Sequence, residues 1–285
     1  MSPLEKHLLV TVSEDLNALF GLRYVFGFFT KRELTRLTLF YVAPRSGGAP
    51  RVPVFLPEDA ARVGEGHRKP PHALAVARDW LVNMGFPPER VELKSSRAKL
   101  GTVKDIVAEA EDGLYDAVVL GRRALTWLDE VFGGSVSHGL LGEHIGFPVW
   151  MCRDSLRDRK NVLLCMDDSE QALRAADHVG FMLQDEPGHR VTIFHATSPG
   201  ASDADRVADL MANAREILTR NGIAEDRIDS LVESSKDTSK RIVQLAGEGR
   251  YAAVAVGRRG LASFFGSTSQ KLLRNLEGAA LWVSK

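Results

Sequence analysis

A glycine-rich stretch near the end of the chain has residue types suited to holding an anion. The apolar run "AAVAV" ends at Gly257, and the sequence continues "GRRGLASFFGSTS". If this run is a strand, Gly257 stands at its carboxyl end, where the lack of a Cβ permits positive φ and close approach to a ligand. Gly266, Ser267 and Thr268 are typical of a helix start, which presents free backbone N–H groups. The stretch therefore predicts a phosphate cradle.

The stretch differs from two common nucleotide-binding loops. The chain has no GxxxxGK[ST] pattern, so it has no Walker lysine, and no complete GxGxxG follows a strand. Arg258 and Arg259 add positive charge, although adjacent arginines on a loop are usually solvated. Spacing alone leaves phosphate binding and a plain strand–loop–helix connection as alternatives.

The same series of short sequence blocks occurs twice in the chain. "YDAVVLGRR" from Tyr115 is matched by "YAAVAVGRR" from Tyr251, and "RLTLFYVAP" from Arg36 is matched by "RVTIFHATSP" from Arg190. The order of the matching blocks is the same in both halves, which indicates a tandem repeat. The first half carries extra residues in its glycine motif and in a Pro/Gly-rich segment at 44–71.

Each half alternates short apolar runs with longer amphipathic segments, a pattern typical of a parallel sheet covered by helices. We expect an α/β fold of two tandem doubly wound domains, each a five-stranded parallel sheet flanked by helices. The domains are placed at 1–155 and 156–285, with a charged join near 153–160. The segment 44–71 is expected to be a surface loop, with a lid or a partner-contact arm as the alternative.

Composition excludes several classes of protein. The 285 residues contain 37 Lys and Arg and 37 Asp and Glu, so the net charge predicts no attraction to nucleic acid or to a membrane surface. No apolar run reaches the roughly 18–20 residues of a membrane span, and the first residues lack the features of a signal peptide. Two cysteines, Cys152 and Cys165, are too few for a disulfide framework. We expect a cytoplasmic protein.

The repeated blocks resemble the universal stress protein family in its tandem two-domain form. "VLLCMDDSEQAL" is similar to the opening strand of the family, and the glycine stretch is similar to its G-x2-G-x9-G-(S/T) motif. The resemblance implies an adenine nucleotide α-hydrolase-like fold and ATP or ADP as ligand, with or without Mg²⁺. It implies a stress-response sensor or regulator that hydrolyses ATP slowly at most.

The resemblance also assigns nucleotide-binding residues in the second half. Asp167 matches the aspartate that the family places near the ribose and adenine. Only five residues separate Gly260 from Gly266, instead of nine, so the loop is shorter by about one helical turn. The full set of residues is Asp167, Gly257, Arg258, Gly260, Gly266, Ser267 and Thr268.

The first half departs from the motif in a different way. Its spacing is intact, but Ala124 replaces the second glycine and Ser13 replaces the aspartate. Its weaker set of nucleotide-binding residues is Ser13, Gly121, Gly134 and Ser135. These departures favour an alternative function, in which the eroded loops have lost the nucleotide and the fold serves as a protein-interaction module.

Other polar residues point to no catalytic or metal site. His195 is expected to be a strand-end histidine with a satisfied hydrogen bond, and its first-half counterpart is Tyr41. An enzyme of the adenine nucleotide α-hydrolase group is the weaker alternative, as is metal binding by Asp167 and Asp168. The cluster of His138, Glu143 and His144 matches no zinc spacing, and neither do His67 and His72.

The closing strands carry tryptophans at equivalent positions, Trp150 and Trp282. An apolar edge strand invites pairing, so the halves are expected to form an internal pseudo-dimer, and the same edge leaves a homodimer open. The alternative is that both tryptophans are ordinary core. For the glycine loop, Gly257→Val is expected to remove nucleotide binding and to leave the fold intact.

Overall fold

The computed structural model describes residues 4–14, 19–43, 71–121, 145–152, 158–200, 203–258 and 267–285. The elements of the first half are β1 (Lys6–Thr11), α1 (Phe20–Phe28), β2 (Thr35–Ala43), α2 (His72–Asn83), β3 (Val91–Arg97), α3 (Thr102–Asp112), β4 (Ala117–Leu120) and β5 (Val149–Met151). Those of the second half are β6 (Val162–Cys165), α6 (Glu170–Leu183), β7 (Val191–Thr197), α7 (Ala204–Arg220), β8 (Ile228–Ser234), α8 (Thr238–Glu248), β9 (Ala253–Gly257), α9 (Ser267–Asn275) and β10 (Ala280–Ser284). The expected loop at 44–70, the join at 153–157 and the cluster at 138–144 lie outside the described residues.

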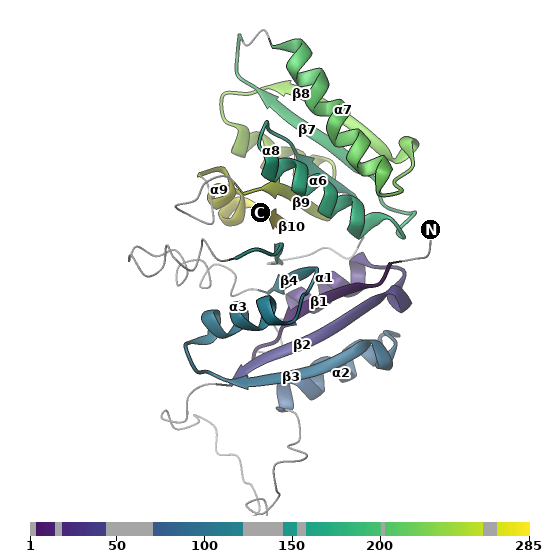
Figure 1. Ribbon diagram of the computed structural model, residues 1–285, viewed down its shortest axis with the longest axis vertical. Coiled ribbons are helices and arrows are strands. Elements are labelled where there is room, and N and C mark those ends of the chain that lie inside the picture. Colours follow the sequence, from purple (N-terminus) through teal and green to yellow (C-terminus); the bar gives the residue numbers. More distant parts are fainter. Residues whose placement is uncertain are drawn as a thin grey trace, which may run out of the picture.

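The ten strands of the described residues belong to one sheet, in the order β3-β2-β1-β4-β5-β10-β9-β6-β7-β8. The sheet runs the length of the molecule, with β3 and β8 at its two ends (Figure 1). Within each half every neighbouring pair is parallel. The predicted α/β class with two doubly wound sets of five strands is confirmed, and the two sets form one continuous sheet.

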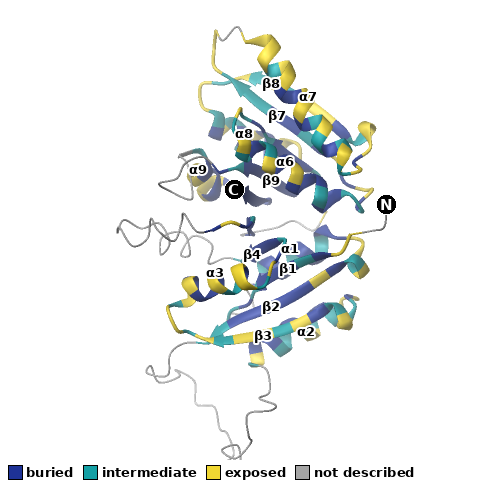
Figure 2. Cartoon of the chain, in the orientation of Figure 1, coloured by how far each residue is buried: buried dark blue, intermediate teal, exposed yellow. Residues whose placement is uncertain are grey.

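Two apolar layers hold the helices on the sheet. Side chains alternate between its faces, so Leu8 and Val10 of β1 belong to one layer and Leu9 belongs to the other. The first layer includes α1, α2, α6 and α7, and the second includes α3, α8 and α9. The strands in the middle of the sheet, β4, β5, β9 and β10, are almost wholly buried, whereas β3 and β8 at its ends are largely exposed (Figure 2).

The helices follow from amphipathic spacing and from their end residues. In α7 the buried residues are Leu210, Met211, Ala214 and Leu218, which lie on one face at helical spacing. Gly222 follows the end of α7 with a φ of +86°, a left-handed conformation in which glycine has no steric penalty. In α6, Ser169 is the N-cap, because its hydroxyl accepts a hydrogen bond from Ala172 N.

The two halves meet where β5 pairs with β10, and this is an antiparallel pairing. Trp282 stands opposite Trp150, and the flanking residues pair symmetrically about them. The two indole rings stack with centroids 4.0 Å apart and an interplanar angle of 2°. Both side chains are fully buried. The tryptophans are thus core residues and the centre of the pairing between halves.

A second contact joins the halves at the end of α1. Glu186, which is 1% exposed, accepts hydrogen bonds from the backbone N–H groups of Thr30 (2.9 Å) and Lys31 (3.0 Å). Lys6, also 1% exposed, forms an ion pair with Asp185 at 3.1 Å. The turn after α6 is therefore bound to the first half by polar contacts in which Glu186 and Lys6 are almost wholly buried and Asp185 is 22% exposed.

Candidate functional site

The topology places a switch point at the carboxyl ends of β6 and β9. The chain leaves β6 toward β7 on one side, and β9 lies on the other side, parallel to β6. Ligands of doubly wound sheets bind outside the carboxyl ends of strands at such a point. Asp167 follows β6 and Gly257 ends β9, so both lie at this edge. The equivalent point in the first half lies between β1 and β4.

Asp167 is fixed by the start of α6. Its Oδ1 accepts a hydrogen bond from Ser169 N at 2.9 Å and a second from the Ser169 hydroxyl. The same hydroxyl oxygen accepts from Ala172 N at 3.2 Å. A carboxylate is stabilised at the N-terminus of a helix by the helix dipole. The short turn therefore holds Asp167 in one orientation at the strand end.

Asp168 forms an ion pair with Arg206 of α7. The two neighbouring aspartates thus have different environments. Within the part of the chain that the structure describes, no group of three or more His, Cys, Asp or Glu side chains is arranged to hold a metal ion.

Gly257 is required for a reason that the sequence did not indicate. A Cβ at this position would lie 2.4 Å from Ala172 N and 2.5 Å from the carbonyl carbon of Gln171, both backbone atoms of α6. Gly257 is not among the described glycines with positive φ, so it is the close approach of the α6 backbone, and not a left-handed conformation, that calls for glycine here. The expectation that Gly257→Val leaves the fold intact is also wrong, because the helix backbone has no room to accept a side chain.

Arg258 is buried rather than solvated. Its side chain is 3% exposed, and its backbone N donates to Ser284 O at 2.7 Å. The expectation of a solvated loop arginine is therefore wrong at this position. Arg259, Gly260 and Gly266 lie outside the described residues.

The helix after the glycine stretch begins at Ser267, as the sequence predicts. Thr268 is half-buried in its first turn. The start of α9 supplies backbone N–H groups that have no partner within the helix itself.

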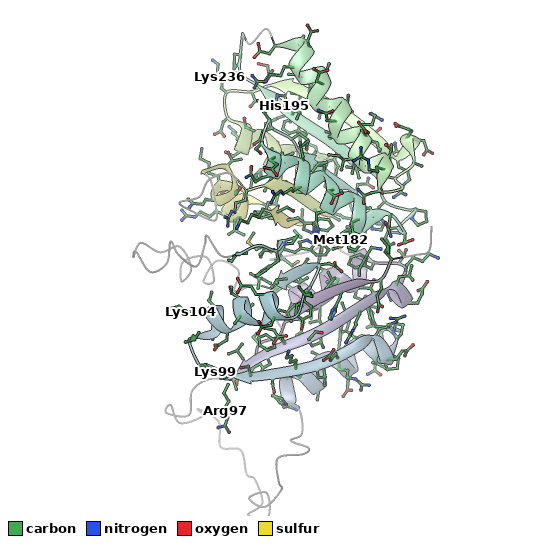
Figure 3. The ribbon with its side chains drawn as sticks, viewed as in Figure 1. Arg97, Lys99, Lys104, Met182, His195 and Lys236 are labelled. Atoms are coloured by element: carbon green, nitrogen blue, oxygen red, sulfur yellow. The ribbon has the colours of Figure 1, made fainter. Side chains whose placement is uncertain are left out.

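His195 lies near the carboxyl end of β7 (Figure 3). Its Nδ1 is 2.9 Å from Met166 O, so the prediction of a strand-end histidine with a satisfied hydrogen bond is confirmed. Met166 is the residue before Asp167, and its N donates to Phe194 O at 2.8 Å. The imidazole is therefore held beside the peptide that leads into Asp167.

Electrostatics at this edge leave Cys165 as a neutral thiol. Burial raises the pKa of the Cys165 thiol, and the negative charge of Asp167 raises it further. A thiolate is the reactive form of cysteine, so Cys165 acts as a small apolar residue of β6. Cys152, which follows β5, is buried, and burial likewise raises its pKa.

The equivalent edge of the first half carries a hydrogen bond between two of its own side chains. Val12 N donates to Phe40 O at 2.9 Å, as Met166 N does to Phe194 O, so Ser13 and Tyr41 stand where Asp167 and His195 stand. Tyr41 OH donates to Glu14 Oε1 at 2.6 Å. This pair was not predicted, because the two residues are distant in sequence and form no motif.

The start of α1 also differs from that of α6. Its N-cap is Leu19, which makes no side-chain capping hydrogen bond. Near this start, a Cβ at Gly21 would lie 3.8 Å from Gly121 N, so the helix passes close to the end of β4. Ala124, Gly134 and Ser135 lie outside the described residues.

Comparison with protein families matched residues 158–283 to the universal stress protein family. Three solved structures are similar to nearly the whole chain. A universal stress protein from Archaeoglobus fulgidus DSM 4304 has a TM-score of 0.63 and 20% identity over 98% of each chain. A functionally unknown protein from Pseudomonas aeruginosa PAO1 has a TM-score of 0.56 and 13% identity over 99% of this chain and 92% of that chain. A protein from Pseudomonas aeruginosa UCBPP-PA14, described as a putative universal stress protein, has a TM-score of 0.55 and 13% identity over 99% and 93%.

At these identities the structural matches establish the fold of both halves. The search of curated proteins found no match. Among the helices of the described residues, none combines the length and the apolar character that crossing a bilayer requires.

Proposed function

We propose that the second half of this chain, whose residues 158–283 match the universal stress protein family, binds an adenine nucleotide, ATP or ADP. In this proposal the chain is a stress-response sensor or regulator, and occupancy of the site is its signal. The observation that carries the proposal is the position of Asp167 and of the starts of α6 and α9 at the switch point between β6 and β9.

The residues at this edge offer hydrogen-bonding groups that match the ribose and the phosphates of a nucleotide. The Asp167 carboxylate accepts hydrogen bonds, which is what ribose hydroxyls donate. The start of α9, with Ser267 and Thr268, suits phosphate oxygens because helix N-termini bind anions. The remaining loop residues proposed for the phosphates are Gly257, Arg258, Gly260 and Gly266.

This site is compatible with a divalent ion even though the protein supplies no full set of metal ligands among the described residues. Mg²⁺ with a nucleotide is held mainly by phosphate oxygens and waters, with one or two carboxylates. Asp167 follows β6, which pairs with β9, and it is the carboxylate proposed for this ion, whereas Asp168 is engaged by Arg206.

We propose binding rather than turnover, with slow ATP hydrolysis at most. The second half has His195 where the first half has Tyr41, so the halves share no histidine at this position. The first half is proposed to lack nucleotide, because Ser13 replaces the carboxylate and the Tyr41–Glu14 hydrogen bond occupies the strand ends.

The test is calorimetric titration of the purified full chain with ATP and ADP, together with extraction of any copurified nucleotide. Asp167→Asn keeps the shape of the side chain and removes its charge, and it is expected to weaken ATP binding about tenfold. Asp168→Asn is the matched control and should bind ATP as the wild type does, because that carboxylate faces Arg206. Equal loss in both variants contradicts the assignment of Asp167.

The alternative is a protein-interaction module of the same fold without a nucleotide. The observation that favours it is the first half, where α1 has no side-chain capping hydrogen bond and Tyr41 is engaged by Glu14 at the strand end. A full chain that carries no nucleotide and binds neither ATP nor ADP supports this alternative.

We also propose that residues 1–155 and 156–285 act as two domains paired as an internal pseudo-dimer. The support is the antiparallel pairing of β5 with β10, which is symmetric about Trp150 and Trp282. Interfaces of this self-complementary kind are those that twofold dimers use. Because β5 and β10 pair within one chain, a homodimer of chains must use another surface.

A further inference from the structure

The hydrogen bond to Met166 O fixes which tautomer the His195 imidazole adopts. The 2.9 Å contact joins Nδ1 to a carbonyl oxygen. A carbonyl oxygen accepts hydrogen bonds and cannot donate, so Nδ1 must carry the proton. In the neutral ring the other nitrogen, Nε2, then has a free lone pair. The side chain is half-buried, so this acceptor lies in a partly enclosed position.

The Nε2 atom of His195 has no hydrogen-bond donor among the residues that the structure describes. The corresponding residue of the first half is in a different state, since Tyr41 OH donates to Glu14. In the second half the carboxylate equivalent to Glu14 is Asp168, and it forms an ion pair with Arg206 of α7. Of these two equivalent strand-end residues, Tyr41 is engaged by Glu14, whereas His195 leaves Nε2 available to a ligand.

The sheet order fixes where His195 lies relative to the rest of the site. The strands run β9-β6-β7, so Asp167 after β6 lies between Gly257 on one side and His195 on the other. Neighbouring strands are about 4.8 Å apart, so β9 and β7 are separated by about 10 Å. A nucleotide is an elongated molecule with its ribose between phosphates and base. With phosphates at β9 and ribose at Asp167, the base lies over the end of β7.

We infer that His195 recognises the base of the nucleotide, with Nε2 accepting a hydrogen bond from the exocyclic 6-amino group of adenine. This inference rests on the proposed function, because it concerns the same site. Hypoxanthine has a carbonyl oxygen in place of that amino group. An oxygen facing the Nε2 lone pair leaves two acceptors in contact, which costs binding energy. His195 therefore makes the site selective for adenine over hypoxanthine.

The test compares ATP with inosine triphosphate by calorimetric titration of the full chain. The wild type is expected to bind ATP about tenfold more tightly than inosine triphosphate, the size expected for one unsatisfied polar contact in a partly enclosed site. His195→Phe keeps a ring of similar size and removes the acceptor. This variant is expected to bind the two nucleotides with equal affinity.

Two further variants separate recognition from structural support. His195→Gln offers both an acceptor and a donor, so it should bind both nucleotides and lose the preference. Tyr41→Phe is the matched control in the first half, and it should keep the wild-type preference. A general disturbance of Asp167 by the substitution lowers both affinities together and leaves their ratio unchanged.

The outcomes distinguish the two levels of the proposal. A wild-type chain that binds both nucleotides equally, or a His195→Phe chain that keeps the wild-type ratio, overturns the role of His195 and leaves nucleotide binding standing. A wild-type chain that binds neither nucleotide overturns the proposed function, and the role of His195 with it.

Discussion

At the residue scale, Gly257 shows that a glycine in a loop motif can be required by packing within the protein and not by a ligand. The atoms that would meet its Cβ are backbone atoms of Gln171 and Ala172. Backbone of a packed helix cannot move aside as the end of a flexible side chain can. Gly257 therefore brings α6 against the end of β9, and this contact also places the start of α6 beside the switch point.

We predict that Gly257→Ala destabilises the protein by about 2 kcal/mol, in the range for overpacked core positions. The measurement is urea denaturation followed by circular dichroism. Gly247→Ala in α8 is the matched control, because a Cβ at Gly247 meets nothing within 4 Å and alanine favours helix. This control should be neutral or more stable by up to about 1 kcal/mol. Equal effects in the two variants contradict the role given to the Gln171–Ala172 backbone.

At the element scale, α6 connects the candidate site to the junction between halves. It starts at Ser169 beside Asp167 and ends at Leu183, before the turn that carries Asp185 and Glu186. In its middle, His178 Nε2 accepts a hydrogen bond from Trp150 Nε1 at 2.9 Å. The buried face of α6 includes Ala172, Ala175, Ala176 and Val179, whose small or branched side chains let the helix lie close to the sheet.

We predict that Ser169→Ala destabilises the protein by about 1 kcal/mol, because it removes the N-cap of α6. Ser169→Thr keeps a hydroxyl and should lose less than half of that amount. Both values come from urea denaturation of the full chain. The substitution to alanine also removes a hydrogen bond from Asp167, so ATP affinity should fall in the alanine variant and be kept in the threonine variant. Identical behaviour of the two variants would show that the hydroxyl is dispensable.

At the scale of the whole molecule, the junction buries ionisable groups from both halves. His178 is 9% exposed and burial lowers its pKa to about 3. His189 is fully buried against Phe28, with ring centroids 4.6 Å apart. Burial lowers the pKa of His189; nearby Glu186 opposes this shift, while Lys160 and Arg227 add to it. Both histidines are therefore neutral when the halves are packed together.

This arrangement predicts a loss of stability in mild acid. In the unfolded chain a histidine titrates near pH 6.5, whereas His178 in the folded protein stays neutral down to about pH 3. Between these values the unfolded state binds more protons, so the stability present above about pH 6.5 is lost as the pH falls. Each buried histidine contributes a slope of about 1.4 kcal/mol per pH unit where its two states differ by one proton.

The measurement is the free energy of unfolding in urea between pH 7.5 and pH 5. His178→Gln keeps an acceptor for Trp150 Nε1–H and removes the titrating group, so its stability should fall less steeply with acid. His72→Gln is the control, because His72 is exposed at the start of α2, and it should keep the wild-type slope. A wild-type stability that is constant across this range contradicts neutral burial of the histidines.

The sequence by itself determined the elements and their order. Runs such as "VLLC" and "ALWVS" became buried strands because continuous apolar segments must be covered on both faces. The local conformational preferences of Ser267 and Gly222 are enough to set the start of α9 and the turn after α7. The sequence also placed Asp167 and Gly257 at the ends of their strands, because strand ends are set by nearby residues.

Only the tertiary structure decided what each of these residues meets. The contact of Gly257 with α6, the ion pair of Asp168 with Arg206 and the burial of Arg258 all depend on segments distant in the chain. The same holds for the stacking of Trp150 on Trp282 and for the hydrogen bond between Tyr41 and Glu14. Periodicity and local preference describe neighbours along the chain, whereas these contacts arise from how the strands are ordered and how closely the helices pack on them.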